Sequence, residues 1–261
     1  MLSEFIIEEW RDSVVTIRLD RPEKRNALSP QMILTLSDIF SELNSQPHVR
    51  AVILTGTGDA AFCAGLDTGA QIAASEQADA RSVSELCHAL CDQIESSGVP
   101  VIAAVNGIAT GVGCELALAC HLKIATDSAQ FSLHEASAGS SRASDSIERL
   151  ARQIGNERVL EIVLTGKTIS AAEALEFGLI NRVAPAAKLR TQAEDFAGEI
   201  GQLAPLAIRA CLEAVIQGAQ LPLTEGLELE AKLFASLFDS DDVREGTSAF
   251  LEKREPIFKG K

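Results

Sequence analysis

A repeated order of elements, two short strands followed by a helix, is the sequence feature that most constrains the fold. Apolar runs of strand length and the helical spacing of apolar residues predict this order twice. The first predicted unit has strands at 5–9 and 14–19 before a helix at 30–44, with Ser29 as its cap and Pro30 as its first residue. The second has strands at 122–125 and 130–133 before helical chain beyond residue 144. Single strands alternating with helices would give βαβ units instead. The order therefore predicts an α/β fold built as a spiral of ββα units.

The middle of the chain combines buried strands with glycine-rich turns. Residues 51–55 and 101–105 are mostly apolar and predict strands, and Asn106-Gly107 predicts a turn before a short helix at 114–120. The strand at 51–55 ends in Gly56-Thr-Gly58, and a loop is predicted to follow through Phe62-Cys-Ala-Gly65. The next helix is predicted from about residue 75 to residue 96.

Ser170 is predicted to cap a helix at 171–177. The last part of the chain is predicted to be helical, at 187–200, 205–217, 222–238 and 241–253. No Ser-, Gly- or Pro-rich linker precedes these helices, so we expect one domain, with a core at residues 1–200 and a helical extension at residues 201–261. One helix carries an apolar cluster at Leu233, Phe234, Leu237 and Phe238. This cluster has two interpretations: it packs against its own chain, or it contacts another subunit.

The charge balance excludes several classes of partner. The chain has 23 Lys and Arg against 37 Asp and Glu, a net charge of −14, and only 4% aromatic residues. It lacks the basic surface and stacking side chains that nucleic-acid binding requires, and its charge opposes anionic membranes. No apolar run is long enough to span a bilayer, and the first ten residues contain no basic segment of a secretory signal. We therefore expect a cytoplasmic protein with no nucleic-acid or membrane partner.

The six cysteines are expected to be free thiols, because no secretory signal places the chain in an oxidising compartment. Cys87, His88 and Cys91 leave a zinc site open as an alternative. No compact Cys-x-x-Cys pair accompanies them, so we predict buried small side chains and no metal.

A glycine-rich loop that opens a helix, residues 105–117, is the first candidate for chemistry. Free N–H groups and a partial positive charge at a helix start suit an anion or a developing oxyanion. Glu115 lies in the first turn of this helix, and Glu135 follows the strand predicted at 130–133. Each carboxylate has a structural interpretation, but two carboxylates near an oxyanion site are what general acid–base chemistry needs.

Together these segments make the chain resemble the enoyl-CoA hydratase/isomerase, or crotonase, family. The likeness covers nearly the whole chain and includes the segments at residues 19–28, 62–65, 105–117, 164–180 and 249–254. The resemblance implies a crotonase-like spiral of ββα units whose C-terminal helices form a homotrimer or a dimer of trimers. It also implies an acyl-CoA thioester substrate and no separate cofactor, since coenzyme A is part of the substrate.

The resemblance assigns roles to particular residues. The backbone N–H groups of Ala64 and Val112 would hold the thioester oxygen, and Glu115 and Glu135 would flank the reacting double bond. Retaining both glutamates favours a hydratase, which adds water reversibly to a 2-enoyl-CoA. The positions that match the family's substrate and CoA contacts are Lys24, Arg25, Ala27, Ala64, Gly65, Leu66, Asp67 and Gly111, with Phe234 and Lys253 contributed by a neighbouring subunit.

One departure from the family pattern falls beside the acyl group. Family hydratases carry a glycine-rich turn after the second glutamate, whereas this chain has Arg142-Ala-Ser-Asp-Ser, and His134 stands where the family often has Pro. His134 and Arg142 are therefore candidates for a rebuilt acyl pocket, although a surface turn explains them equally well. The alternatives to a hydratase are an enoyl-CoA isomerase, another crotonase-fold acyl-CoA lyase or hydrolase, and a non-catalytic protein that binds CoA esters.

Overall fold

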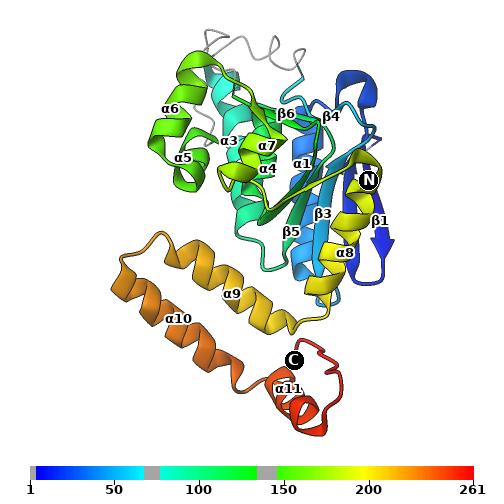
Figure 1. The fold of residues 1–261 in the computed structure, drawn as a ribbon, viewed down its shortest axis with the longest axis vertical. Coiled ribbons are helices and arrows are strands. Elements are labelled where there is room, and N and C mark those ends of the chain that lie inside the picture. Colours follow the sequence, from blue (N-terminus) through cyan, green and yellow to red (C-terminus); the bar gives the residue numbers. More distant parts are fainter. Residues whose placement is uncertain (1–3, 68–76, 134–145) are drawn as a thin grey trace.

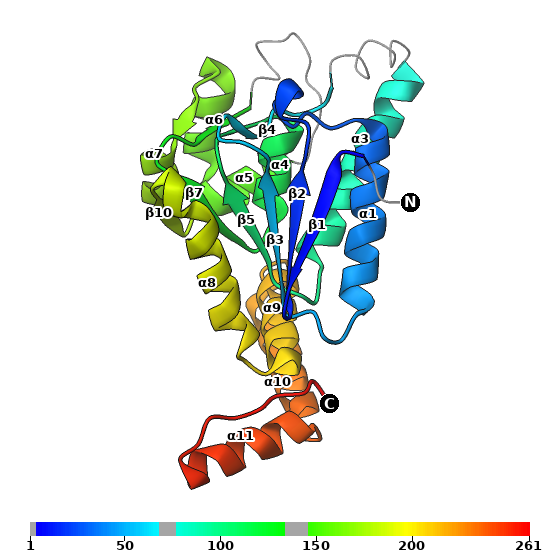
Figure 2. The same ribbon diagram turned by 90° about the vertical axis from the view of Figure 1, so that its right-hand side faces the viewer.

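The computed structural model describes residues 4–67, 77–133 and 146–261, and it contains two sheets surrounded by helices (Figures 1 and 2). A six-stranded sheet has the strand order β1-β2-β3-β5-β7-β10, and a four-stranded sheet has the order β4-β6-β8-β9. The N-terminal hairpin pairs β1 (Ile6–Arg11) with β2 (Val14–Leu19) in antiparallel fashion, and β2 then pairs in parallel with β3.

Three consecutive ββα units run through the middle of the chain and confirm the predicted spiral. Their first strands, β3 (Ala51–Gly56), β5 (Val101–Val105) and β7 (Leu122–Thr126), are parallel neighbours in the larger sheet. Their second strands are parallel neighbours in the smaller sheet: β4 (Ala61–Cys63), β6 (Ile108–Thr110) and β8 (Gln130–Ser132). Their helices are α3 (Gln77–Glu95), α4 (Val112–Ala119) and α5 (Ser146–Ile154).

The structure corrects the prediction of a loop through Phe62-Cys-Ala-Gly65. Ala61–Cys63 forms β4, and its three side chains are buried. Three residues are too few to show a period in the sequence, and the strand exists because β6 pairs with it from a distant part of the chain.

Two helical layers enclose the larger sheet. On one face lie α1 (Pro30–Ser45), α3 and α4. They contribute Leu36, Leu90 and Leu116, respectively, to the larger apolar core. On the other face lies α8 (Leu189–Gly201), which packs Leu189, Ala193 and Ala197 against the sheet (Figure 2). Ser29 caps α1 by accepting a hydrogen bond from the Met32 N–H at 3.3 Å, as the sequence predicted.

The chain between α5 and α8 adds one strand to the edge of each sheet, β9 beside β8 and β10 beside β7. Its elements are α6 (Asn156–Thr165), β9 (Ile169–Ser170), α7 (Ala171–Glu176) and β10 (Arg182–Ala184). Ser170 and Glu173 form a reciprocal capping box at the start of α7, which confirms the cap predicted at Ser170.

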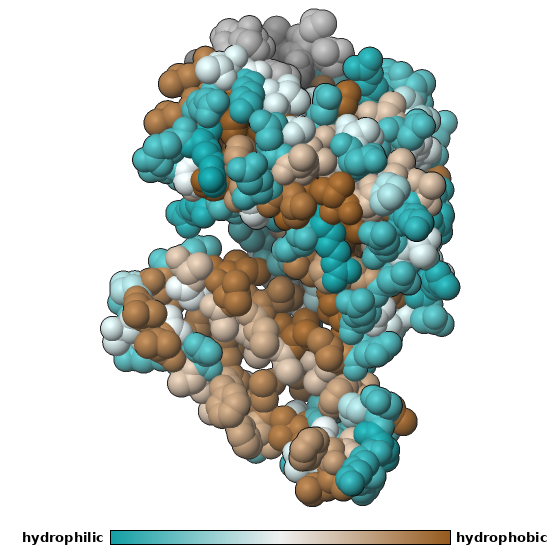
Figure 3. Space-filling view, in the orientation of Figure 1, coloured by the Kyte–Doolittle hydropathy of each residue, from teal (hydrophilic) through white to brown (hydrophobic). Residues whose placement is uncertain are grey.

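The last three helices project away from the sheets (Figure 1). They are α9 (Pro205–Gly218), α10 (Leu223–Leu237) and α11 (Asp241–Glu252). No residue of α9 or α10 is buried, and Figure 3 shows apolar residues gathered over these two helices. Phe234 and Phe238 contact each other edge to face at 5.0 Å but remain 62% and 58% exposed. Packing within the chain therefore leaves the predicted apolar cluster uncovered. None of the described helices is both long enough and apolar enough to cross a membrane.

Candidate active site

The segments that the sequence singled out leave the smaller sheet at one edge. β4, β6 and β8 are parallel, so their C-terminal ends meet there, with Thr110 directly opposite Ser132 in the register. Ala64 and Gly65 follow β4, while Gly111 and Val112 follow β6. The strand that leads towards Glu135 is β8, the neighbour of β6. Glu135, His134 and Arg142 themselves lie outside the described residues.

The start of α4 is built on a glycine with left-handed backbone. Gly111 has φ of +51°, and its N–H donates to the Ser132 carbonyl oxygen at 3.1 Å, which ties the turn to β8. Val112 is the first helical residue, so its N–H belongs to the first turn, where no intrahelical acceptor is available. A backbone donor at this point needs no particular side chain, so Val112 can supply it.

Two glycines bring the β4 loop against this helix start. A Cβ on Gly113 would lie 2.1 Å from the Cys63 carbonyl oxygen, so only glycine lets α4 sit this close to β4. Gly65 has φ of +92°, and a Cβ there would lie 3.0 Å from the Thr110 carbonyl oxygen and 3.8 Å from the Val112 nitrogen. The peptide that follows Gly65 is therefore adjacent to the first N–H of α4.

In the loop after β4, one of the possible oxyanion donors already has a hydrogen-bond acceptor. The Ala64 N–H, which the sequence assigned to the oxyanion hole, donates to the Arg25 carbonyl oxygen at 3.0 Å. The Gly65 carbonyl oxygen accepts from the Leu28 N–H at 2.8 Å. Because the peptide is trans, the Leu66 N–H points to the side opposite Leu28. Ala64 serves as a donor only if its bond to Arg25 breaks when substrate binds.

Glu115 occupies the first turn of α4 and is buried, with 1% of its surface exposed. The positive end of the helix favours a carboxylate in this turn. Burial and then the Glu115 charge raise the pKa of Cys91 on α3 well above that of an ordinary thiol. Burial of Glu115 holds its carboxylate away from bulk water.

Nucleophilic thiol chemistry is not what this site provides. Burial raises the pKa of Cys63, at the end of β4, to about 12, so the side chain is a neutral thiol at physiological pH. Within the described residues, no group of three His, Cys, Asp or Glu side chains could hold a metal ion.

A charged network fixes the loop that precedes α1, and sequence reasoning missed its central residue. Both the Arg21 guanidinium and the Lys24 ammonium group contact Asp67 Oδ2 at 2.9 Å. Arg21 is buried and also donates to the Ala27 carbonyl oxygen at 3.0 Å. Ion pairs thus join the loop before α1 to the loop after β4. These two loops contain three of the predicted CoA contacts, Lys24, Arg25 and Asp67. Only the charge of Arg21 was visible in the sequence, because its burial depends on the approach of a distant segment.

Two asparagines also shape the site, and of these the sequence indicated only Asn106, as a turn residue. Asn26 Nδ2 donates to the carbonyl oxygens of Thr57 and Ala61, at 3.1 and 2.8 Å. Asn106 Nδ2 donates to the carbonyl oxygens of Gly58 and Ala61, at 2.8 and 2.9 Å. The two amides hold the turn between β3 and β4 from both sides and so set where the Ala64–Asp67 loop begins.

The remaining predicted CoA contacts do not join this site within one chain. Phe234 lies on α10 and Lys253 follows α11, in the part that projects away from the sheets (Figure 1). Their assignment to a neighbouring subunit stays a prediction.

Comparison with known proteins places this geometry in a family. The enoyl-CoA hydratase/isomerase family matches residues 9–261. The chain belongs to that family. It is 34% identical to the crotonyl-CoA hydratase of Syntrophomonas wolfei, over 99% of both chains. It is also 34% identical to the (E)-benzylidenesuccinyl-CoA hydratase of Thauera aromatica, over 97% of this chain and 98% of that protein.

A solved structure supports the same assignment. The crystal structure of an enoyl-CoA hydratase from Bacillus anthracis superimposes with a TM-score of 0.96 at 37% identity, over 99% of this chain and 100% of that one. This chain is therefore an enzyme of the enoyl-CoA hydratase/isomerase family with the crotonase fold.

Proposed function

We propose that the protein is an enoyl-CoA hydratase that reversibly adds water to a 2-enoyl-CoA and gives a 3-hydroxyacyl-CoA. One observation carries this proposal: a buried carboxylate, Glu115, lies one turn from backbone donors at an edge where three parallel strands end. The relatives named as hydratases of crotonyl-CoA and of a much larger aryl-substituted acyl-CoA are consistent with it.

The backbone donors act on the thioester. When water adds to the Cβ atom, negative charge develops on the thioester oxygen, and two N–H groups aimed at that oxygen stabilise the enolate-like transition state. Val112 supplies one donor from the first turn of α4. The Leu66 N–H is better oriented for the second role than that of Ala64, because it lies in the peptide beside Val112 and points away from Leu28.

The glutamates handle the protons. Glu115 and Glu135 together position a water molecule and accept one of its protons, while its oxygen bonds to Cβ. A proton is delivered to Cα, so the elements of one water molecule are added across the double bond. Glu135 follows β8 in the sequence, and β8 pairs with β6, the strand that leads into α4.

The alternative functions require different chemistry at the same site. An isomerase moves a proton between two carbons and needs no bound water, and a non-catalytic binder needs neither carboxylate. The presence of two glutamates, one of them buried in a helix start, favours the hydratase. The hydratase also requires no thiol or metal, in agreement with the neutral Cys63 side chain.

We also propose that the active protein is a homotrimer or a dimer of trimers in the cytoplasm. The uncovered apolar surface of α9 and α10 supports the assembly, and the five buried free thiols suit a reducing compartment. A neighbouring subunit would bring Phe234 and Lys253 to the CoA moiety, which Lys24 and Arg25 contact through their charge. We expect CoA affinity to fall with added salt.

Hydration of crotonyl-CoA, followed by loss of the enoyl-thioester absorbance, tests the function. Glu115→Gln and Glu135→Gln should each lower kcat by about 10²–10⁴-fold, because general acid–base catalysis contributes that much. Glu157→Gln, at an exposed position on α6, is the matched control and should keep full activity. Near-normal turnover in both active-site variants, or conversion of a 3-enoyl-CoA but not of crotonyl-CoA, would reject the hydratase assignment.

A further inference from the structure

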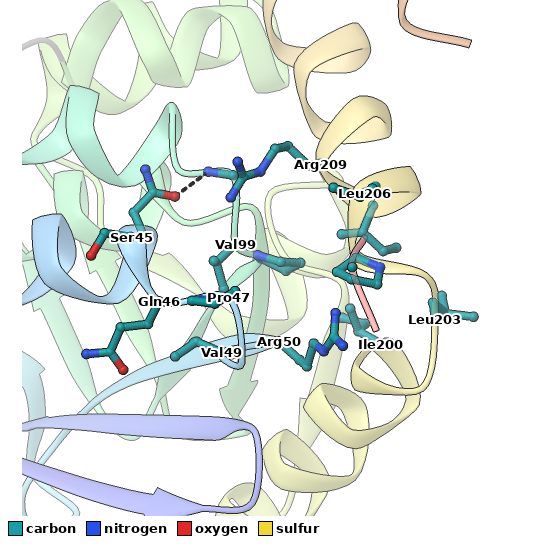
Figure 4. Close-up of a pocket in the computed structure, with 16 residues that line it drawn as sticks. Ser45, Gln46, Pro47, Val49, Arg50, Val99, Ile200, Leu203, Leu206 and Arg209 are labelled. Atoms are coloured by element: carbon teal, nitrogen blue, oxygen red, sulfur yellow. Dashed lines mark hydrogen bonds between the residues drawn. The ribbon is translucent and has the colours of Figure 1, made fainter. Parts of the chain in front are cut away.

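A cavity separate from the proposed active site lies where the helical extension leaves the core. Its volume is about 360 Å³, and its lining comes from the turn before β3, the turn before β5, the α8–α9 connection and α9 (Figure 4). β3 and β5 begin at this cavity, whereas the proposed active site lies beyond the C-terminal ends of strands. The two sites are therefore at opposite ends of the spiral.

Arg50 supplies one cationic group to this cavity. Its Nη2 donates to the Phe258 carbonyl oxygen at 3.1 Å, which fixes the guanidinium against the C-terminal segment. Its Nη1 is buried and has no hydrogen-bond acceptor within reach among the described residues. A buried guanidinium N–H without an acceptor is costly, so Arg50 keeps hydrogen-bonding capacity that the described part of its own chain leaves unused.

Arg209 supplies the second cationic group from α9. A Cβ on Gly98 would lie 2.6 Å from Arg209 Nε, so glycine at this position leaves the space that the Arg209 side chain crosses. Figure 4 shows the two arginines entering from different elements, Arg209 from α9 and Arg50 from the turn before β3.

The charge of the cavity is opposite to that of the whole protein. The chain carries a net charge of −14, yet the residues that line the cavity include two arginines and no Asp or Glu. In the part of the chain that the structure describes, neither arginine has a carboxylate within ion-pair distance. The cavity walls are largely apolar, with Val99, Ile200 and Leu206 among them.

We propose that this cavity binds a small amphipathic carboxylate, a free acid with a short apolar chain. Each guanidinium group suits a carboxylate, to which Arg donates charge-assisted and often paired hydrogen bonds. The apolar walls suit the chain of the ligand, and the volume lies within the range of about 300–1,000 Å³ of small-molecule sites. The proposal is independent of the hydratase assignment.

Calorimetric titration of the purified wild-type protein with octanoate tests the proposal. Excess CoA is present throughout, so that the proposed active site is occupied. We expect one octanoate per chain. Arg50→Met and Arg209→Met should each raise the Kd by about tenfold or more, because each removes a charge-assisted hydrogen-bonding group. Arg50→Lys keeps the charge and should lose less affinity than Arg50→Met. Arg152→Met, which removes an exposed arginine on α5, should leave the Kd unchanged.

Two control ligands test separately how the apolar chain and the charge of octanoate contribute to binding. Octan-1-ol has the apolar chain without the charge, and inorganic phosphate has charge without the chain, so both should bind at least tenfold more weakly than octanoate. Octanol binding as tightly as octanoate, phosphate binding as tightly as octanoate, or an unchanged Kd in both Met variants would overturn the proposal. No octanoate binding at all, with a changed oligomeric mass in the Met variants, would also overturn it and would identify the cavity as a subunit contact.

Discussion

Helices α4 and α10 are both rich in apolar residues, but the protein treats them in opposite ways. In α4, every residue from Gly113 to Ala119 is buried. In α10 no residue is buried, and Leu223, Leu227 and Phe234 are 78%, 54% and 62% exposed. The first helix carries the proposed catalytic carboxylate, and the second belongs to the proposed subunit interface.

The difference shows which parts of the protein one chain can complete alone. β4 and β6, α3 and α5 all pack against α4, so the surroundings of Glu115 are fixed by the monomer. The extension has no such partner in its own chain, since α10 packs mainly against α9. Exposed apolar surfaces of this kind indicate protein contacts. Catalytic geometry and assembly should therefore respond to different substitutions.

The strongest test of this separation is Gly113→Ala. A Cβ 2.1 Å from the Cys63 carbonyl oxygen forces α4 away from β4, and overpacking against backbone should cost about 3 kcal/mol of unfolding free energy. Gly198→Ala on α8 is the matched control, because a Cβ there meets nothing within 4 Å. Replacing that helical glycine should stabilise the protein by about 0.5–1 kcal/mol.

Urea unfolding of both variants measures the two values. If Gly113→Ala proved as stable as the wild type, the close contact between α4 and β4 would not be what fixes the catalytic corner. That result would contradict the expectation that the monomer alone fixes the surroundings of Glu115.

Leu227→Asp on α10 tests whether the exposed apolar face of this helix forms a subunit interface. A charge on an apolar contact must be desolvated without a partner, so we expect assembly to weaken by about 2 kcal/mol and chains to dissociate at micromolar concentration. Leu34→Asp is the control, because Leu34 is also an exposed leucine, 43% accessible, but lies on α1 of the core. Analytical ultracentrifugation distinguishes the outcomes, and an unchanged mass for Leu227→Asp would exclude α10 from the interface.

Local sequence signals predicted the parts of the fold that depend on local physics. Ser29-Pro30 predicted the start of α1, and Ser170 predicted the cap of α7, because a cap is formed within one turn of chain. Strand-length apolar runs predicted the ββα order at β1, β2 and α1 and again at β7, β8 and α5, but not the second strands β4 and β6. The residues at the start of α4 were also visible, because glycines before a helix with an early Glu form a local pattern.

Features that depend on distant pairing were not predictable in this way. β4 is three residues long and exists through its pairing with β6. Arg21 could not be distinguished from its charged neighbours, because its burial depends on Asp67. The occupation of the Ala64 N–H by Arg25 depends likewise on two loops meeting. Family resemblance supplied roles for these positions but not their hydrogen bonds.

The smallest predicted effect concerns His121, which follows α4 and fastens it to the core. Its Nδ1 accepts from the Val101 N–H at 2.9 Å, and its Nε2 lies 3.1 Å from the Glu95 carbonyl oxygen. This pair of contacts requires the neutral ring with its proton on Nε2, since a proton on Nδ1 would face another N–H. Burial lowers the pKa of His121, and the nearby Lys123 charge lowers it further.

Because the pKa of His121 is lower in the folded state, the unfolded chain binds the proton more readily. Stability should therefore fall as pH drops below about 6.5, by at most about 1.4 kcal/mol per pH unit for one proton. His121→Gln cannot titrate, so its unfolding free energy should depend less on pH between 6.5 and 5 than that of the wild type. Urea unfolding across this range compares the slopes, which separates the titration from any constant cost of the substitution. Equal slopes would show that acid acts on the protein somewhere other than the end of α4.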